Sequence, residues 1–365
     1  MKRLKTIIQS ILGVPLVRRS IAVFSRLNAT VFSSSYLLSI PYHWLAFLGF
    51  MREQRAVLDG KRRYHAAAGV PRPNRVELRR NIHRLEKGLL MEPLRDVFAK
   101  EYILETAEVF AEAVDQSVAG KEPIDQDELF WANSVLSEFF SVTRPEGNLG
   151  RAAAIFAPAS ARLAANDLER KPYVRPAPGE LPSYEALLNL SRHRRSVRWF
   201  LPEPVDRALI DKALLVARQA PTACNRLPYV FRIIDDPKLV KKVANIPFGT
   251  AGYADNIPVI AVLVGKLDAY FSARDRHAIY VDTSLAAMSF AYALEVQGLS
   301  TCMINWPDFE PLEQKMQRAL KLHFSDRVVM LMAIGYADPQ RKVPFSQKKV
   351  ISSIREYNFE GRSCD

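Results

Sequence analysis

Glycine is scarce in this sequence of 365 residues: there are 15, or about 4%, where roughly 7% is usual. Neither of the common glycine-rich phosphate loops occurs, since GxGxxG and GxxxxGK followed by Ser or Thr are both missing. The P-loop and Rossmann classes of nucleotide-binding protein therefore lose their main support. A content of 48% hydrophobic and 25% charged residues also excludes a wholly disordered or collagen-like chain.

Cysteine is rare as well. The three cysteines, Cys224, Cys302 and Cys364, are odd in number and far apart. This spacing argues against a disulfide framework and against a CxxC metal site. We therefore expect a reducing, cytoplasmic compartment and no bound metal.

Acidic residues are absent from the first 52 positions, which hold seven of the twelve excess positive charges. Residues 31–51 are largely apolar, but serines, Pro41 and His43 interrupt them, which makes a poor membrane-spanning helix. Arg18 and Arg19 interrupt the earlier apolar run, which argues against a secretory signal. The pattern predicts a segment that lies on an anionic membrane surface, peripheral on its inner face.

Two alternatives for residues 1–52 stay open. The segment could be a helical part of the fold with a solvated basic face, or an acid-poor organelle-targeting peptide that is removed. Binding of nucleic acid is not expected, because the basic residues match none of the usual nucleic-acid-binding motifs.

The length predicts two domains. Apolar residues recur every three or four positions between residues 75 and 166, as in packed helices. Residues 171–183 contain four prolines, which favours an extended linker. We divide the chain into a basic apolar segment (1–60), a helical domain (61–170), this linker, and a final domain (184–365).

Helices and strands alternate after the linker, which predicts a layered α/β domain. Helices are expected over 184–193, 207–219, 238–244, 278–297 and 312–322, and strands over 229–234, 257–264, 300–304 and 328–336. The helix over 278–297 is apolar all round, which predicts burial on every side. A second subunit is one source of that cover, so we expect a homodimer.

A basic motif, residues 194–198 (RRSVR), directly follows the first of these helices. In an extended chain, Arg194, Ser196 and Arg198 share one face. Two guanidinium groups beside a hydroxyl suit a terminal phosphate. The alternative is a basic helix end in which Arg194 complements the helix dipole.

Three further motifs follow. Residues 221–229 (PTACNRLPY) combine small side chains, which let a backbone approach a flat ring, with an Asn that can donate and accept at a ring edge. A plain connecting loop is the alternative. Residues 298–306 (GLSTCMINW) lead from the long helix into a strand, and a basic pair at 341–342 follows the last strand.

In this order and spacing the four motifs resemble the FMN-dependent nitroreductase family over residues 184–359, about half of the chain. The resemblance implies an α+β fold: a nitroreductase-like layered α/β domain with a central mixed sheet, preceded by a helical N-terminal region. It also implies a homodimer with FMN at the interface. The residues that would bind the cofactor are Arg194, Arg195, Ser196, Arg198, Pro221, Thr222, Ala223, Asn225, Met303, Ile304, Asn305, Arg341 and Lys342.

These residues would have different roles in such a protein. The first four, with the basic pair Arg341 and Lys342, match positions around the FMN phosphate. The 221–225 loop matches one that crosses from the other subunit, and residues 303–305 match the segment over the isoalloxazine ring. No catalytic side chain is required, since the flavin supplies the chemistry.

The activity implied is that of an FMN-dependent oxidoreductase. NADH or NADPH would donate hydride, and an electron-poor small molecule would then be reduced in the same place by a ping-pong mechanism. A different class stays open: a membrane-associated accessory or interaction protein with a flavin-binding or degenerate nitroreductase fold.

This sequence departs from the family at several points. Residues 247–256 lack a lysine that many members place near the flavin, and the bulky Trp306 would make the pocket narrow or differently shaped. Residues 79–89 (RRNIHRLEKGL) resemble a motif of long nitroreductase-like proteins that accompany bacterial surface-polysaccharide synthesis. The alternative is a charged amphipathic helix with a glycine C-cap. We expect Asp282, at the start of the long apolar helix, to be a cap or interface residue.

Overall fold

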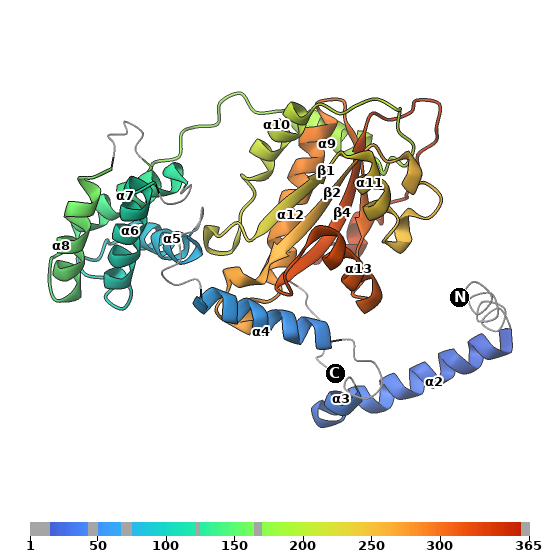
Figure 1. Cartoon of the computed structure of the whole chain (residues 1–365), viewed down its shortest axis with the longest axis horizontal. Helices are drawn as coiled ribbons and strands as arrows, with labels where there is room; N and C mark the ends of the chain where they lie inside the picture. Colours follow the sequence, from blue (N-terminus) through green and yellow to red (C-terminus); the bar gives the residue numbers. More distant parts are fainter. Residues whose placement is uncertain (1–14, 43–49, 67–74, 121–124, 164–169, 359–365) are drawn as a thin grey trace.

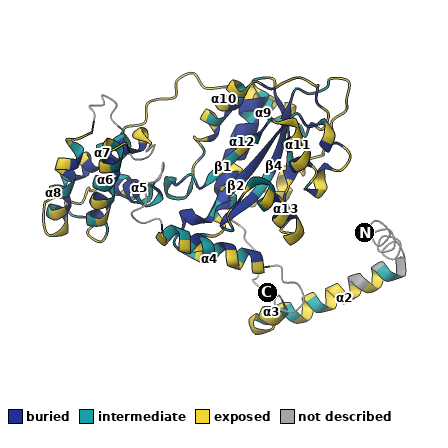
Figure 2. Ribbon diagram, in the orientation of Figure 1, coloured by how far each residue is buried: buried dark blue, intermediate teal, exposed yellow. Residues whose placement is uncertain are grey.

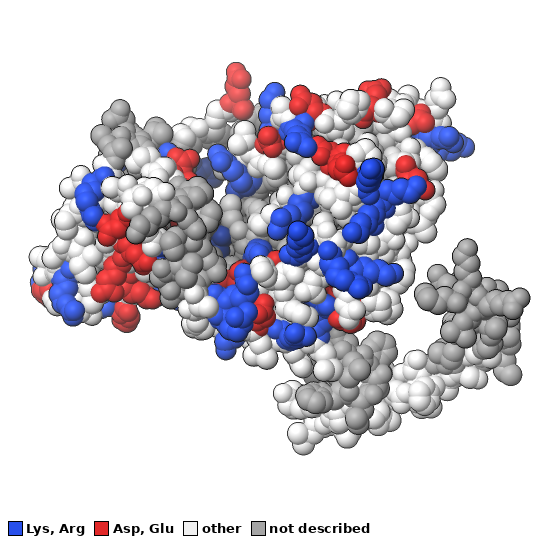
Figure 3. Space-filling view, viewed as in Figure 1, with Lys and Arg blue, Asp and Glu red and all other residues white. Residues whose placement is uncertain are grey.

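A computed structural model describes residues 15–42, 50–66, 75–120, 125–163 and 170–358. Figure 1 shows a helical bundle beside a sheet domain, with a helical arm at the N-terminal end. Lys and Arg gather on α4 (Met51–Ala66) and the adjoining sheet domain in Figure 3, whereas Asp and Glu gather on the bundle. The two halves of the chain thus differ in surface charge as well as in structure.

The sheet has four strands in the order β1 (Tyr229–Ile234), β2 (Val259–Lys266), β4 (Asp326–Gly335), β3 (Ser300–Asn305). All three pairings are antiparallel. The single parallel pairing among the described residues is a bridge from Ser196 to Thr301. The mixed sheet that we expected is therefore an antiparallel sheet, with parallel character at this bridge alone.

Helices cover both faces of the sheet (Figure 1). On one face, α10 (Arg207–Ala217) packs against α12 (Ala278–Glu295), which crosses β2, β3 and β4. On the other, α11 (Pro237–Ala244) and α13 (Glu310–Leu320) bury Val240 and Met316 in a second core. Every helix and strand predicted after the linker is present, with ends that differ by at most two residues.

Local signals explain where these helices begin. The Ser183 hydroxyl accepts a hydrogen bond from the Ala186 amide at the start of α9 (Tyr184–His193). Asp206 caps α10 in the same way. Such caps satisfy amide groups that have no partner within the helix.

The bundle contains α5 (Val76–Leu89), α6 (Ile103–Val118), α7 (Gln126–Val142) and α8 (Asn148–Ser160) around a core of its own. The helical periodicity predicted for this region is thus confirmed. Helix α5 ends at Leu89 with Leu90 as its C-cap, so Gly88 lies inside the helix and the expected glycine C-cap is wrong.

Helix α4 packs on the sheet domain and runs across the boundary that we placed at residue 60. A Cβ at Gly60 would stand 2.8 Å from the Leu267 carbonyl oxygen, so the two backbones approach closely. Arg52 forms ion pairs with Glu310 and, at 3.7 Å, with Glu313. The domain division stays a prediction, and residues 171–183 contain neither helix nor strand.

The N-terminal arm consists of α2 (Pro15–Ser33) and α3 (Tyr36–Tyr42). Its apolar side chains, among them Phe24, Leu27 and Leu37, are exposed (Figure 2). Of the helices described, none is long and apolar enough to cross a membrane. Residues 1–14 and 43–49, part of the segment predicted to lie on a membrane, fall outside the described residues.

Candidate functional site

The basic motif is held at one edge of the sheet. The Val197 amide donates to the Thr301 carbonyl at 3.0 Å, and the Leu201 amide donates to the Tyr336 carbonyl at 2.8 Å. The motif therefore follows α9 in extended form and runs past the start of β3 and the end of β4. Arg194 is also the C-cap residue of α9. The structure is therefore compatible with both interpretations of Arg194, as a phosphate ligand and as a charge that complements the helix dipole.

The late basic pair returns to the same edge. The Arg341 guanidinium lies 5.2 Å from the centre of the Trp199 ring. The Asp338 amide donates to the Trp199 carbonyl at 3.0 Å, and Lys342 is exposed beside Arg341. The fold thus brings residues 194–198 and 341–342 together, although 143 positions separate Arg198 from Arg341.

Strand β3 begins beside the basic motif and carries the third group of predicted residues at its far end. Ile304 is buried in the core, Met303 is half-buried, and Asn305 is exposed at the end of the strand. Trp306 turns inward, where its indole N–H donates to Glu313 at 2.8 Å. The expectation that Trp306 narrows a pocket is therefore wrong.

At residues 194–198 and 341–342, which we call the basic edge, polar atoms lack a hydrogen-bond partner in the described part of the chain. Nε of Arg194 and Oγ1 of Thr301 are buried without a hydrogen-bond partner among the described residues. Within those residues no carboxylate lies within 4.0 Å of the guanidinium of Arg194, Arg195 or Arg198. Buried polar atoms are normally satisfied, and guanidinium donors beside a serine hydroxyl fit a phosphate. The donor set therefore fits the phosphate of FMN.

Two buried groups adjoin this edge. The Glu295 carboxylate lies 3.5 Å from Nε2 of His193, and burial raises the pKa of Glu295 above its ordinary value. Arg198 lies over the Tyr253 ring at 5.9 Å, and burial raises the pKa of the Tyr253 phenol. The positive charge of Arg194 acts against the effect of burial and lowers the pKa of Glu295.

The 221–229 loop lies elsewhere, at the start of α12. The Ala223 amide donates to Oδ2 of Asp282 at 3.0 Å, and the Tyr270 hydroxyl donates to the same oxygen at 3.3 Å. Asp282 thus binds a loop amide from within α12, whose N-cap is His277, so the expectation that Asp282 caps this helix is wrong, and its role as an interface residue stays a prediction. Burial raises the pKa of Asp282, whereas these two hydrogen bonds lower it.

The loop backbone is strained. Cys224, Asn225 and Leu227 have φ values of 55°, 52° and 48°. Left-handed backbone is costly for residues other than glycine, although Asn tolerates it better than most. Contacts from outside the loop must therefore hold this conformation.

The helical bundle supplies one such contact, which the sequence analysis missed. Nε of Arg79, on α5, donates to the Asn225 carbonyl at 2.8 Å. Nη1 of the same residue pairs at 2.9 Å with the buried carboxylate of Glu128 on α7. Arg79 belongs to the motif of residues 79–89, which was noted in the sequence for another reason. No pattern in the sequence links Arg79 to Asn225, which lies 146 positions away.

The predicted residues therefore form two groups in a single chain. The loop contacts Asp282 and the basic edge contacts Glu295, and these two residues of α12 are 13 positions apart. At 1.5 Å per helical residue that is roughly 20 Å. One chain by itself does not bring residues 221–225 to the basic edge.

Between the two groups, one side of α12 is open. Val281, Leu285 and Val296 are 57%, 44% and 68% exposed, so the expected burial on every side is wrong for the single chain. An apolar groove of about 460 Å³ continues this side toward α9 and α10, lined by Val216 and Tyr292 among others. Apolar surface of this kind marks an interaction site.

The C-terminal half of the chain is similar to known proteins. The family model "Nitroreductase family" matches residues 191–251 and 240–336. Iodotyrosine deiodinase 1 of Pongo abelii is 21% identical over 193 residues, which cover 45% of this chain and 66% of that protein. An NADH dehydrogenase of Thermus thermophilus is 32% identical over 75 residues, which cover 20% of this chain and 36% of that protein.

Further matches to known proteins also cover only part of this chain. A 5,6-dimethylbenzimidazole synthase of Rhodobacter capsulatus is 39% identical over 59 residues, 16% of this chain and 29% of that protein. The chain thus spans between 29% and 66% of the length of these curated relatives. An FMN-dependent nitroreductase of Clostridium difficile R20291 aligns in structure with a TM-score of 0.41 and 20% identity, over 47% of this chain and 98% of that one. A nitroreductase family protein of Streptococcus pneumoniae TIGR4 gives 0.41 and 20%, over 47% and 99%.

The family match covers the basic motif, the 221–229 loop and all four strands. It indicates an oxidoreductase and does not favour the accessory-protein alternative. Residues 191–336, which are 146 of the 365 positions, match the nitroreductase family model, so this part of the chain is similar to that family.

Proposed function

We propose that the protein is an FMN-dependent oxidoreductase that takes electrons from NADH or NADPH and reduces an electron-poor small molecule. The observation that carries the proposal is the basic edge: three arginines with no carboxylate within 4.0 Å among the described residues, fixed beside β3 within the family match. FMN, when bound, would supply the hydride chemistry, with donor and acceptor binding in turn at the same place.

The chain's own residues would bind and orient the cofactor. Arg194, Arg195, Ser196 and Arg198 would hold its phosphate through charge-assisted hydrogen bonds. Arg341 and Lys342 would add positive charge from the chain that follows β4. Met303, Ile304 and Asn305 would present the β3 backbone to the ring.

The loop residues would act on a partner subunit. We propose a homodimer in which α12 packs against its copy, because the open apolar side of α12 separates the two halves of the site. Pro221, Thr222, Ala223 and Asn225 of one subunit would then lie at the basic edge of the other. The left-handed backbone at Asn225 would present its amide side chain there.

The N-terminal arm would attach the protein to an anionic membrane surface. Its exposed apolar side chains and its lack of acidic residues support this proposal. The link to surface-polysaccharide synthesis stays a prediction, since it depends on the resemblance of residues 79–89 alone.

An absorbance spectrum of the purified full-length protein from 300 to 600 nm tests the proposed function. We expect flavin bands that bleach anaerobically with NADH or NADPH. Arg194→Gln combined with Arg198→Gln should lose the flavin, whereas Arg207→Gln, an exposed arginine paired with Asp235, should keep it. A protein that stays colourless after incubation with FMN would refute the proposal, and bands that do not bleach would refute the electron donor.

A further inference from the structure

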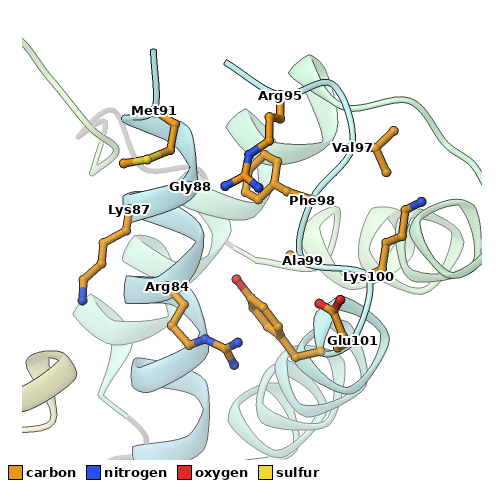
Figure 4. A pocket seen from close by; sticks show the side chains of 11 residues that line it. Arg84, Lys87, Gly88, Met91, Arg95, Val97, Phe98, Ala99, Lys100 and Glu101 are labelled. Carbon is orange, nitrogen blue, oxygen red and sulfur yellow. The ribbon is translucent and has the colours of Figure 1, made fainter. Parts of the chain in front are cut away.

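A second basic site lies in the helical bundle, apart from the motifs used above. A pocket of about 450 Å³ opens between the last turns of α5 and the chain that joins α5 to α6. Figure 4 shows the side chains of Arg84 and Arg95 turned toward this space from opposite walls. Its charged and polar lining residues are Arg84, Lys87, Arg95, Lys100, Glu101 and Tyr102.

The charge of this pocket is not balanced by the protein. Four cations and one carboxylate, Glu101, line it, which leaves a net charge of +3. Among the described residues, no carboxylate lies within 4.0 Å of any of the four cationic groups. Two acids on the same segments are engaged elsewhere: Glu86 accepts from Trp131 at 2.9 Å, and Asp96 pairs with Arg144.

Three other arginines of the bundle are paired, although Arg80 and Arg151 have no carboxylate within 4.0 Å among the described residues. Arg75, Arg79 and Arg162 each form an ion pair with a carboxylate. Like charges that converge without a counter-charge destabilise a fold through mutual repulsion. Arg84 and Arg95 face the pocket, whereas Lys87 and Lys100 point away from it (Figure 4). The approach of these two arginines without a carboxylate within 4.0 Å among the described residues is therefore better explained by an anion that binds there.

The walls of the pocket are fixed by packing. A Cβ at Gly88 would stand 2.2 Å from Cε2 of Phe98, so only a glycine lets the joining chain lie this close to α5. Phe98 in turn packs edge-on against Phe139 in the core, with ring centres 4.8 Å apart. Arg84 lies 3.6 Å above the Tyr102 ring, which limits the motion of its guanidinium. A preorganised site loses less entropy when its ligand binds.

Helix α6 adds to the attraction for an anion. It begins directly after the pocket residue Tyr102 and runs for 16 residues. Its N-cap makes no side-chain hydrogen bond, although Glu105 in its first turn offsets part of the positive end of the helix. Guanidinium forks and a helix N-terminus are both favourable partners for phosphate oxygens.

We propose that this pocket binds a diphosphate group, either free or as part of a small phosphorylated compound. The two arginines that face the pocket can each bind one phosphoryl group of a diphosphate, and Lys87 and Lys100 add positive charge beside it. The proposal does not depend on flavin binding, because the residues belong to the bundle.

Titration calorimetry of the full-length protein with inorganic pyrophosphate tests this assignment. We expect saturable binding that Arg95→Gln combined with Lys100→Gln weakens by at least about tenfold, since each charge-assisted hydrogen bond lost has an effect of that order. Both side chains are exposed, so the variant should fold. Lys238→Gln combined with Lys242→Gln on α11 removes the same charge elsewhere and should leave the affinity unchanged.

Several outcomes would overturn the proposal. Absence of saturable binding up to about 10 mM pyrophosphate would do so, as would equal affinity in the Arg95/Lys100 variant and the parent protein. If that double variant does not fold, Arg95→Gln alone is compared with Lys238→Gln. Vesicles of phosphatidylcholine with phosphatidylglycerol identify the other source of phosphate: a loss of vesicle binding in the variant, without pyrophosphate binding, would assign the pocket to lipid headgroups and overturn the soluble ligand.

Discussion

Arg79 joins the helical bundle to the 221–229 loop, and its replacement gives our most specific prediction. Its guanidinium contacts the Asn225 carbonyl at 2.8 Å and the Glu128 carboxylate at 2.9 Å. Arg79→Met alone would leave Glu128 as a buried unpaired carboxylate, at a cost of roughly 3–5 kcal/mol to the whole bundle. The informative variant is therefore Arg79→Met with Glu128→Gln, which removes both charges together.

The magnitude follows from the loop backbone. Left-handed backbone at Cys224 and Leu227 costs roughly 1–2 kcal/mol per residue. The contacts that oppose this cost are the Ala223 amide on Asp282, the Leu227 amide on Thr222 Oγ1, and Arg79 on the Asn225 carbonyl. A hydrogen bond from a charged donor contributes about 1.5–3 kcal/mol. Its loss should therefore increase opening of the loop by about 10- to 150-fold.

Hydrogen–deuterium exchange of peptides from residues 221–229 measures this opening. The double variant is compared with Glu128→Gln alone, which keeps the Arg79 contact to the loop. We expect faster exchange in the loop of the double variant. Equal exchange in the two proteins would refute the idea that the bundle holds the loop closed.

Three further predictions concern other parts of the molecule. Leu285→Glu should convert a dimer into a monomer in analytical ultracentrifugation, because it places a charge on the open side of α12. Gly88→Ala should lower the free energy of unfolding by about 1–3 kcal/mol in urea titrations, because the added methyl group meets a buried ring. The Arg52 hydrogen bond holds the pKa of Glu310 below its ordinary value, so this pair stabilises the fold at neutral pH and that contribution is lost as acid protonates Glu310. Between about pH 6 and pH 3, the Glu310→Gln variant should therefore lose less stability than the parent protein. The difference between the two losses should be at most about 1 kcal/mol, because Glu310 is half exposed.

Each of these predictions has a matched control. Val118→Glu places the same charge on an exposed apolar residue of the bundle and should leave the oligomeric state unchanged. Gly179→Ala adds a methyl group where no atom lies within 4 Å and should leave stability unchanged. A dimeric Leu285→Glu protein, equal losses at both glycines, or identical pH profiles of parent and Glu310→Gln would contradict the respective reasoning.

The sequence predicted the elements of the sheet domain well, because local patterns determine them. β-branched and apolar runs identify β2, and Pro221 marks the turn that follows α10. The arrangement of these elements in space was harder to predict from the sequence. The order β1-β2-β4-β3 brings Ser196 to Thr301, a pairing that no spacing in the sequence reveals.

Contacts between the two halves of the chain were not predicted at all. Arg52 reaches Glu310 across 258 positions, and Arg79 reaches the loop across 146. Both arginines stand in basic segments that look like solvated helix faces in the sequence. Which charged side chains are buried depends on tertiary packing, and Trp306 was misjudged for the same reason: its environment is set by Glu313 on α13.

The separation of the basic edge from the 221–229 loop along α12 has a consequence for defective copies of the protein. In the proposed symmetric homodimer, each site would take its basic edge from one subunit and its loop from the other. A chain defective at Arg194 and a chain defective at Asn225 would each be inactive alone. Mixed together, they would form hybrid dimers in which one site has two intact parts, and roughly a quarter of all sites would recover activity. Two damaged copies could thus complement each other, which two chains with the same lesion could never do.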